Sequence, residues 1–255
     1  MKDSVKKPIY IYRYTHNGRT QVIPCTVSLM SLSDLDEAVR LHKKVSLGLG
    51  PEIFVATTDE ELEMLLGDKG VSVGVWHEGR LISMRAVQTD AGWVNESLVK
   101  MGLPPDPEMK TAVTDHCIVD KEYRGNNIQF LTNYEVESLV AERFSTIATT
   151  VAPMNIFSFK NILLCNFHIV GLDLQYGGYL RYTMLKRFRA EESIWTNAHL
   201  AIPIRDIKKQ QQAMKEGMVG FKLKRMPTGF TVFYAPMSEK PPAGARSSRK
   251  PPKSP

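Results

Sequence analysis

The stretch that decides the fold is VDKEYRGNNIQFLTNYEVESL, residues 119–139. It reads as a strand end, a tight polar turn and a helix, and the turn places Arg124, Gly125, Asn126 and Asn127 where the helix begins. An ordinary helix start needs only one capping side chain. A site for a phosphate-bearing ligand needs several free backbone N–H groups, a helix N-terminus and a nearby cation. The turn therefore predicts a phosphate site.

The rest of the chain predicts a mixed α/β architecture in layers, with this turn after a central strand. Alternating apolar residues, capping boxes and Gly-containing turns separate the elements. Residues 91–110 contain three prolines and read as an irregular loop over a site. The expected strands are residues 9–14 and 21–30 around an Asn17–Gly18 turn, a pair at 71–90 turning at Glu78–Gly79, strands at 111–120 and 144–151, a hairpin at 167–188 turning at Gly177–Gly178, and two short strands after 217. The expected helices are residues 33–45, 57–66, the turn to about Arg143, 153–165 and 202–217.

The net charge of +6 lies at the two ends of the chain. Residues 238–255 carry five Lys or Arg and one acid, and residues 1–7 carry three Lys and one Asp, so the body between them is close to neutral. We therefore do not expect the folded part to bind nucleic acid. The Pro-rich residues 238–255 read as a disordered basic tail.

Cysteine usage and hydropathy indicate a cytoplasmic protein. The 3 cysteines are widely spaced and odd in number, which argues against a disulfide framework. No apolar run approaches the roughly 20 residues that span a bilayer, and the first residues lack the apolar core of a secretory signal. The 6 histidines form no HxxxH or His/Cys cluster, so we expect no metal site.

Two motifs within residues 113–185 resemble the core of the GNAT N-acetyltransferase superfamily. The first family signature is a strand, a short acidic link and R/Q-x-x-G-x-G/A at a helix start; here TDHCIV, DKEY and RGNNIQ (residues 114–129) take those places. The second is an Asn followed three residues later by Ser or Ala on a helix, which Gly-Phe closes into a strand. Here NIFS (155–158) and Asn166–Phe167 supply it. Asn127 stands at the first Gly of the first signature, and Gln129 stands at its last small residue.

This resemblance implies a fold and a division of the chain. The fold would be α/β, with a mixed, mostly antiparallel central sheet flanked by helices and a small C-terminal α/β extension. The segments would be an N-terminal segment and strand (1–19), the acyltransferase domain (20–190), an extension packed on that domain (191–237) and the tail (238–255).

The resemblance also implies acetyl-CoA as co-substrate, with its diphosphate on the amides of the turn and at the positive end of the helix. The pantetheine arm would pair with the strand before the turn. The residues that would bind the coenzyme are Cys117, Ile118 and Val119 along the arm, Arg124, Gly125, Asn126, Asn127, Ile128 and Gln129 at the diphosphate, and Asn155 and Ser158 beside the arm and the diphosphate or thioester.

Catalysis in this family is direct transfer from the thioester to an amine, so a base is needed only to deprotonate an ammonium substrate. Asp115 and His116 lie on the central strand, where either could take that proton. Many family members place a Tyr seven residues after the motif Asn, where this chain has Ile162. Tyr176, before the Gly177–Gly178 turn, is the candidate that could replace it as proton donor.

The sequence thus predicts an N-acetyltransferase that moves an acetyl group from acetyl-CoA to a primary amine. The acceptor can be a metabolite, an antibiotic, a peptide N-terminus or a lysine side chain. One alternative is a GNAT-fold protein that binds acyl-CoA, or senses it, without turnover. A second is a basic-tailed scaffold for RNA or acidic surfaces. Exposed strand edges leave a homodimer open.

Overall fold

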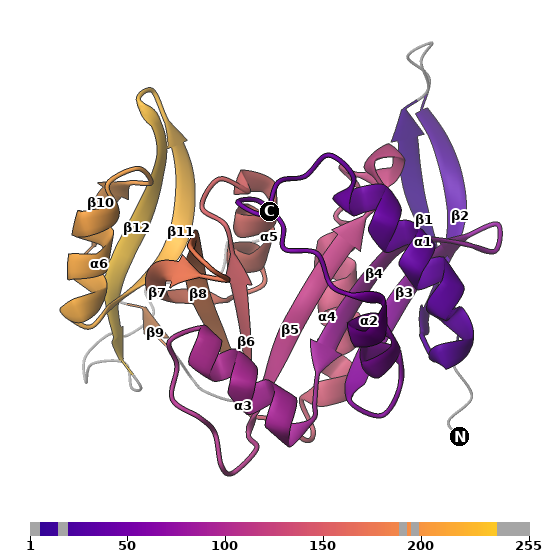
Figure 1. The fold of residues 1–255 in the computed structure, drawn as a ribbon. Helices are drawn as coiled ribbons and strands as arrows, with labels where there is room; N and C mark the ends of the chain where they lie inside the picture. The colour runs from indigo at the N-terminus through magenta and orange to yellow at the C-terminus, as the bar shows by residue number, and fades with distance from the viewer. Residues whose placement is uncertain (1–5, 15–19, 189–192, 195–198, 239–255) are drawn as a thin grey trace, which may run out of the picture.

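The computed structural model describes residues 6–14, 20–188, 193–194 and 199–238 (Figure 1). The strands of these residues join in one large sheet, with β9 (Ser193–Ile194) paired to β12 beside it. In spatial order the sheet holds β1 (Lys7–Tyr14), β2 (Thr20–Leu29), β3 (Gly70–His77), β4 (Arg80–Gln88), β5 (Thr111–Val119), β6 (Thr146–Val151), β8 (Tyr179–Arg187), β7 (His168–Gln175), β11 (Met218–Met226), β12 (Gly229–Ser238) and β10 (Leu200–Pro203). Every neighbouring pair is antiparallel except β5 and β6, as the expected fold class requires.

Helices cover both faces of this sheet. In Figure 1, α1, α2 and α3 lie in front of the central strands and α4 lies behind them. The two faces are visible in β5, where Ile118 packs in the core under α1 and α2 and Val119 packs in the core under α4. The helices are α1 (Leu35–Ser46), α2 (Asp59–Leu66), α3 (Ala91–Lys100), α4 (Ile128–Val140), α5 (Ile156–Leu164) and α6 (Ile207–Lys215), with 3₁₀ turns η1 (Leu32–Asp34) and η2 (Lys121–Tyr123).

Local sequence signals fix most of these elements. Thr58 and Glu61 form the capping box of α2, and Glu78 and Gly79 form the β3–β4 turn with φ of 49° and 77°. The first helix is preceded by a 3₁₀ turn, so its capping box joins Ser31 to Asp34 and lies two residues before the expected start at Ser33.

Residues 91–110 were expected to be an irregular loop, and this expectation is wrong for the first half. Residues 91–100 form α3, whose N-terminus is capped by the Asp90 side chain on the Trp93 backbone N–H. Val94 and Leu98, four residues apart, are buried against the sheet. The helical spacing of these two residues outweighs Gly92 and the prolines that follow.

The expected helix at residues 202–217 is shorter than predicted and is preceded by a strand. Ile202 is buried and pairs with Val232 of β12, so residues 200–203 form β10. The helix α6 begins only after Asp206, whose side chain caps it. The Asn17–Gly18 turn and the basic tail lie outside the described residues.

The C-terminal strands continue the sheet through a close contact between β7 and β11. Gly220 pairs with Ile169, and a Cβ at Gly220 would lie 2.4 Å from the Ile169 side chain, so only glycine permits this approach. Behind it, the hydroxyl groups of Tyr182 and Tyr234 both donate to Oε1 of the buried Gln210, at 2.6 and 2.8 Å. These bonds hold α6 and the C-terminal strands (left in Figure 1) on the rest of the sheet.

Candidate functional site

The sheet opens between its only two parallel strands among the described residues. β5 and β6 pair only from Thr111–Thr146 to Val113–Ala148. β5 then continues to Val119, paired to β4, and β6 continues to Val151, paired to β8. One edge of β5 is therefore left without a strand partner over its last residues. An extended ligand arm can add to such an edge as a strand would.

The backbone groups on this free edge belong to Cys117 and Val119. The Asp120 N–H donates to the Ile82 carbonyl of β4 at 2.9 Å. Because backbone groups alternate in direction along a strand, Ile118 also faces β4, while Cys117 and Val119 face the opening. The Val119 carbonyl accepts a hydrogen bond from Arg124 Nε at 3.1 Å, which leaves the Cys117 groups and the Val119 N–H for a ligand.

The turn at the end of β5 exposes a run of backbone N–H groups. Gly125 and Asn127 have φ of 84° and 55°, and Asn127 is the N-cap of α4 without a side-chain capping bond. Within the described residues, the N–H groups of residues 125–129 have no hydrogen-bond acceptor. Five free amides at the positive end of a helix form an anion-binding concavity.

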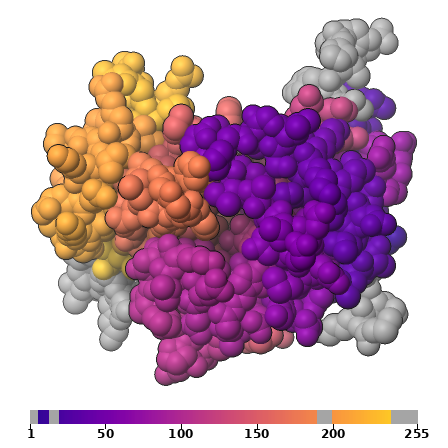
Figure 2. Space-filling model, in the orientation of Figure 1, coloured from indigo at the N-terminus to yellow at the C-terminus, as the bar shows by residue number. Residues whose placement is uncertain are grey.

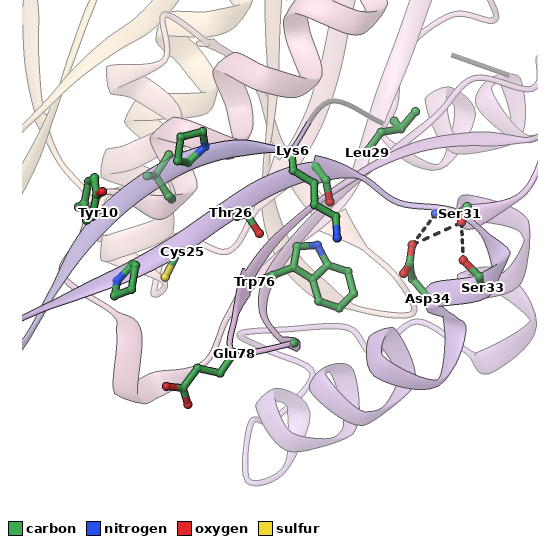
Figure 3. A pocket seen from close by; sticks show the side chains of 15 residues that line it. Lys6, Tyr10, Cys25, Thr26, Leu29, Ser31, Ser33, Asp34, Trp76 and Glu78 are labelled. Carbon is green, nitrogen blue, oxygen red and sulfur yellow. Dashed lines mark hydrogen bonds between the residues drawn. The ribbon is translucent and has the colours of Figure 1, made fainter. Parts of the chain in front are cut away.

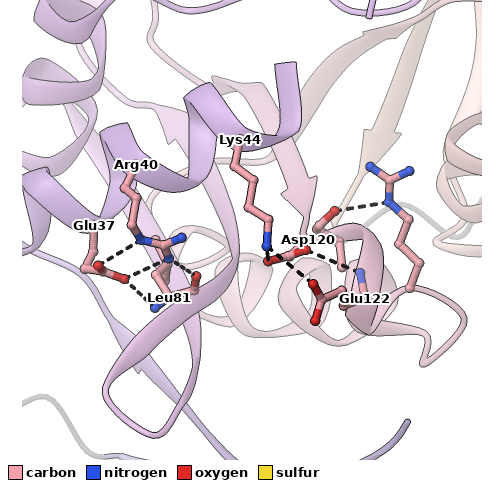
Figure 4. A network of polar contacts seen from close by, with 8 residues as sticks. Glu37, Arg40, Lys44, Leu81, Asp120 and Glu122 are labelled. Carbon is pink, nitrogen blue, oxygen red and sulfur yellow. Dashed lines mark hydrogen bonds and ion pairs between the residues drawn. The ribbon is translucent and has the colours of Figure 1, made fainter. Parts of the chain in front are cut away.

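Side chains around this turn hold it in place and leave its amides free. The Asn126 side chain bonds both the N–H and the carbonyl of Tyr12 on β1, each at 2.7 Å. Lys44 on α1 bonds the Asp120 carboxylate at 2.6 Å and lies 3.9 Å from Glu122 (Figure 4). The turn is thus fixed from β1 on one side and from α1 on the other.

Asn155 and Ser158 lie at the start of α5, which packs beside α4. The Asn155 side chain accepts from the Ser158 N–H at 3.3 Å and so caps α5. Its amide N–H groups have no acceptor within the described residues. Farther along, Asn161 Nδ2 donates to Gln129 Oε1 at 2.6 Å and joins the two helices. Gln129, which replaces a small residue of the motif, therefore bonds to α5.

A bulge on β5 brings Asp115 and His116 to the same face of the sheet. Ala86 pairs with His116 and Val87 with Thr114, so Asp115 has no partner in β4. His116 Nδ1 lies 2.9 Å from Asp115 Oδ1, and the Thr57 hydroxyl donates to the same oxygen at 3.2 Å. The His116 side chain is 2% exposed and that of Asp115 is 16% exposed, so only the carboxylate is open to a substrate.

The Asp115 carboxylate is ionised and hydrogen-bonded at both oxygens. Gln88 Nε2 donates to Oδ2 at 2.7 Å, and the Ser97 hydroxyl of α3 fixes Gln88 through its Oε1 at 2.7 Å. Burial raises the pKa of Asp115, but the hydrogen bonds from His116, Gln88 and Thr57, with the charge of His116, outweigh it and hold the pKa below its usual value.

His42 of α1 supports this cluster from behind. Its Nε2 accepts the Thr57 backbone N–H at 3.1 Å, and its ring lies edge-on to His116 at 5.8 Å. Burial, with a smaller contribution from His116, lowers the pKa of His42 to about 4. His42 is therefore neutral at pH 7, with its proton on Nδ1, and it fixes Thr57 beside Asp115.

Tyr176 reaches the other side of the opening. Its hydroxyl lies 3.0 Å from Thr150 Oγ1 on β6, the strand that diverges from β5. Burial raises the pKa of Tyr176, and the negative charge of Asp115 adds to the shift, so the hydroxyl stays protonated at neutral pH. Asp115 and Tyr176 thus place a carboxylate and a phenol on the two sides of one opening.

The connection between α1 and α2 (residues 47–58) forms hydrogen bonds to β8 on one side of this opening and to β5 on the other. Arg181 of β8, 3% exposed, donates to the Pro51 and Glu52 carbonyls at 2.5 and 2.9 Å, and Thr57 bonds Asp115 on the β5 side. Figure 2 shows a hollow bordered by these indigo residues, the orange β7–β8 hairpin and the magenta α3.

Solved structures identify the fold. An acetyltransferase of the GNAT family from Streptococcus pneumoniae is 16% identical, with a TM-score of 0.51 over 64% of this chain and 99% of that chain. Arabidopsis thaliana NAA60, in complex with a bisubstrate analogue, is 16% identical, with a TM-score of 0.50 over 64% and 99%. The chain has the GNAT fold. No family model and no curated protein matches it.

Within this GNAT fold, Ile162 occupies the position where the resemblance expects a Tyr. It is partly buried and packs against the main hydrophobic core, and its side chain has no proton to donate. Sequence reasoning singled out Asp115, His116 and Tyr176 but not His42, Thr57, Gln88 or Arg181. Their contacts join α1, β4, β5 and β8, and no local sequence signal marks them.

A pocket of about 640 Å³ lies elsewhere on the GNAT fold, against β1 and β2 (Figure 3). Its lining includes Tyr10, Asp34 and Trp76 of β3, and β4 lies between β3 and β5 in the sheet, so the pocket is not part of the candidate site. In the described ranges, no group of three His, Cys, Asp or Glu could hold a metal ion. No helix in the same ranges has the length and apolar character needed to cross a membrane.

Proposed function

We propose that this chain is an N-acyltransferase that moves an acetyl group from acetyl-CoA to a primary amine. The observation that carries the proposal is the run of five unbonded amides at residues 125–129, directly after the free edge of β5. Diphosphate needs such donors, and a pantetheine arm needs such an edge. The residues present therefore fit both parts of the coenzyme, and the neighbour from Arabidopsis thaliana was solved in another crystal with acetyl-CoA.

The residues divide into a binding set and a reacting set. The amides of residues 125–129 would hold the diphosphate, and Cys117, Val119 and Asn155 would pair with the arm. Bound acetyl-CoA supplies a thioester carbonyl to which the amine nitrogen adds; a C–N bond forms, the C–S bond breaks and a thiolate leaves.

Asp115 and Tyr176 would manage the protons of this transfer. The ionised Asp115 would bind the substrate ammonium and accept its proton, which frees the nitrogen lone pair. His116, Gln88 and Thr57 would keep the carboxylate aimed at the opening. Tyr176, protonated because its pKa is raised, would donate a proton to the departing thiolate. The second proton of the nitrogen passes to solvent. The proton held by Asp115 returns through solvent to the Tyr176 phenolate, so both side chains are restored and one proton is released for each amide formed.

The test is calorimetric titration of acetyl-CoA into the purified protein, followed by a screen of primary amines for released thiol. The panel would hold an alkylamine, an aminoglycoside, a peptide with a free N-terminus and one with an acetylated N-terminus and a lysine. We expect binding between about 1 µM and 1 mM, the usual range for substrates, and thiol release with at least one class. Absence of binding at millimolar acetyl-CoA would refute the proposal.

A non-catalytic acyl-CoA-binding protein is the second candidate, and two observations favour it. Ile162 cannot transfer a proton, and three donors already occupy the oxygens of Asp115, which weakens that carboxylate as a base. The screen separates the two functions, because this candidate would bind acetyl-CoA and release no thiol with any amine. The cytoplasmic location, the homodimer and a role for the basic tail stay predictions.

A further inference from the structure

A buried arginine without a counter-ion lies beneath the first turn of α4. Arg85 of β4 is 5% exposed and stands on the sheet face that α4 covers, opposite Cys117 on β5. Its guanidinium donates to the Gln129 carbonyl at 3.0 Å and reaches the Thr132 hydroxyl at 3.5 Å. Among the described residues, no carboxylate lies within ion-pair distance of it.

Glu137, farther along α4, does not compensate the charge of Arg85. Glu137 accepts from Lys186 at 2.6 Å and from Asn133 at 2.7 Å, so its carboxylate is already paired. Arg85, Glu137 and Lys186 all act on the nearby Cys165 thiol, whose pKa burial raises to about 11. This interior region therefore holds two cations and one anion.

An unpaired cation at this place is unfavourable for two reasons. A charge removed from water needs a partner of opposite sign, and two neutral hydrogen-bond acceptors do not supply one. The guanidinium also lies against the positive end of α4, since Gln129 belongs to the first turn of that helix. A bound anion at the amides of residues 125–129 would compensate both charges together.

We propose that Arg85 is a coenzyme-binding residue whose buried charge attracts the diphosphate of acyl-CoA to the turn before α4. This inference rests on the proposed function, and it adds a residue outside the motif that suggested that function. Arg85 lies on β4, some 40 residues before the turn, and its side chain contacts the first turns of α4 on the face that packs on the sheet. It would strengthen a phosphate site in which Asn127 and Gln129 replace the small residues of the motif.

The experiment compares two ligands that differ in the diphosphate. Acetyl-CoA and S-acetylpantetheine share the thioester arm, and only the first carries phosphate. Each would be titrated into the wild-type protein, Arg85→Met and Arg85→Lys. We expect Arg85→Met to weaken acetyl-CoA binding at least about tenfold, because it removes a cation that would attract the diphosphate through the protein interior, where charges are weakly screened. S-acetylpantetheine should bind all three proteins alike, and Arg85→Lys should keep most of the acetyl-CoA affinity.

The control is Arg143→Met, at an exposed arginine just beyond the other end of α4. Arg143 donates to the Thr89 carbonyl at 3.4 Å and stacks on Phe144, so it is also a cation held by neutral groups. Its loss should leave acetyl-CoA binding unchanged. Melting temperature gives a second readout. Without ligand, Arg85→Met should melt no lower than the wild type, because it removes an uncompensated charge, and acetyl-CoA should raise its melting temperature less.

The failures are distinguishable. Equal acetyl-CoA affinity in the wild type and Arg85→Met would overturn the inference and leave the proposed function standing. Equal loss of both ligands, or a large fall in the melting temperature of both Arg85 variants, would assign Arg85 a structural role and overturn it as well. A wild-type protein that binds neither ligand would overturn the proposed function and the inference with it.

Discussion

Replacing Gly125 by Ala tests the amide turn by adding a single methyl group. Gly125 has a φ of 84°, and a Cβ at this position would meet no other heavy atom within 4 Å. The substitution therefore causes no steric clash with neighbouring residues. Its effect is the backbone strain of an L residue in the left-handed region, about 1–2 kcal/mol.

This strain should appear in coenzyme affinity. The turn is exposed, so the variant can relax in the free protein to a conformation in which the amides of residues 125–129 no longer point together. Binding then has to restore the left-handed conformation. Since 1.4 kcal/mol corresponds to a factor of ten, we expect acetyl-CoA affinity to fall by about five- to thirtyfold.

The control is Gly79→Ala in the β3–β4 turn. Gly79 has a φ of 77° and equally open surroundings, so its variant carries the same strain away from the site. Calorimetry should show weaker acetyl-CoA binding only for Gly125→Ala, while chemical denaturation shows a loss of unfolding free energy for Gly79→Ala. If Gly125→Ala binds acetyl-CoA as tightly as the wild type, the turn is not the coenzyme site and the reasoning fails.

Three further predictions concern the opening beside β5. Asp115→Asn should lower kcat by about 10²–10⁴-fold without changing acetyl-CoA affinity; steady-state kinetics that show less than a tenfold loss would rule out proton transfer to Asp115. Tyr176→Phe should lower kcat while the unfolding free energy changes by about 1 kcal/mol or less, and an unchanged kcat would contradict a role as proton donor. His42 has a folded pKa of about 4, below its unfolded value of 6.5, so protonation favours the unfolded chain and stability is lost as pH falls between these values, by up to about 1.4 kcal/mol per pH unit. Urea denaturation at pH 7 and pH 5 should therefore show a smaller loss for His42→Phe than for the wild type, and equal losses would contradict this assignment.

Turn residues in the sequence correctly predicted the strands and helices whose ends they mark. The Gly177–Gly178 turn, with φ of 80° and 126°, and the Glu78–Gly79 turn fixed two hairpins. The strand–turn–helix around Gly125 predicted the GNAT fold. Positions with positive φ favour Gly and Asn, so Gly125 and Asn127 could be recognised from the sequence.

α3 was missed because Gly92 and the prolines that follow obscured the helical spacing of Val94 and Leu98. β10 was missed because its evidence is tertiary: Ile202 pairs with Val232 of β12, a strand later in the chain.

The supporting residues of the site could not be predicted for a related reason. The bulge that turns Asp115 and His116 to one face arises from a register shift between β4 and β5, which no single strand encodes. His42 reads as an ordinary position on an amphipathic helix, and Arg85 as a residue in an apolar strand. Only the packed sheet shows that the first fixes Thr57 and that the second lacks a counter-ion.

The two bonds between Asn126 and Tyr12 connect the turn before α4 to the edge strand β1. By thermodynamic linkage, a ligand that orders the turn must also strengthen the docking of β1. The equilibrium constant for docking rises by the same factor by which docked β1 raises the affinity for the ligand. Resistance of residues 7–14 to an aminopeptidase would then report acyl-CoA binding without any label on the coenzyme. For the same reason, an affinity tag ahead of β1 that weakens the docking of this strand should also weaken acyl-CoA binding.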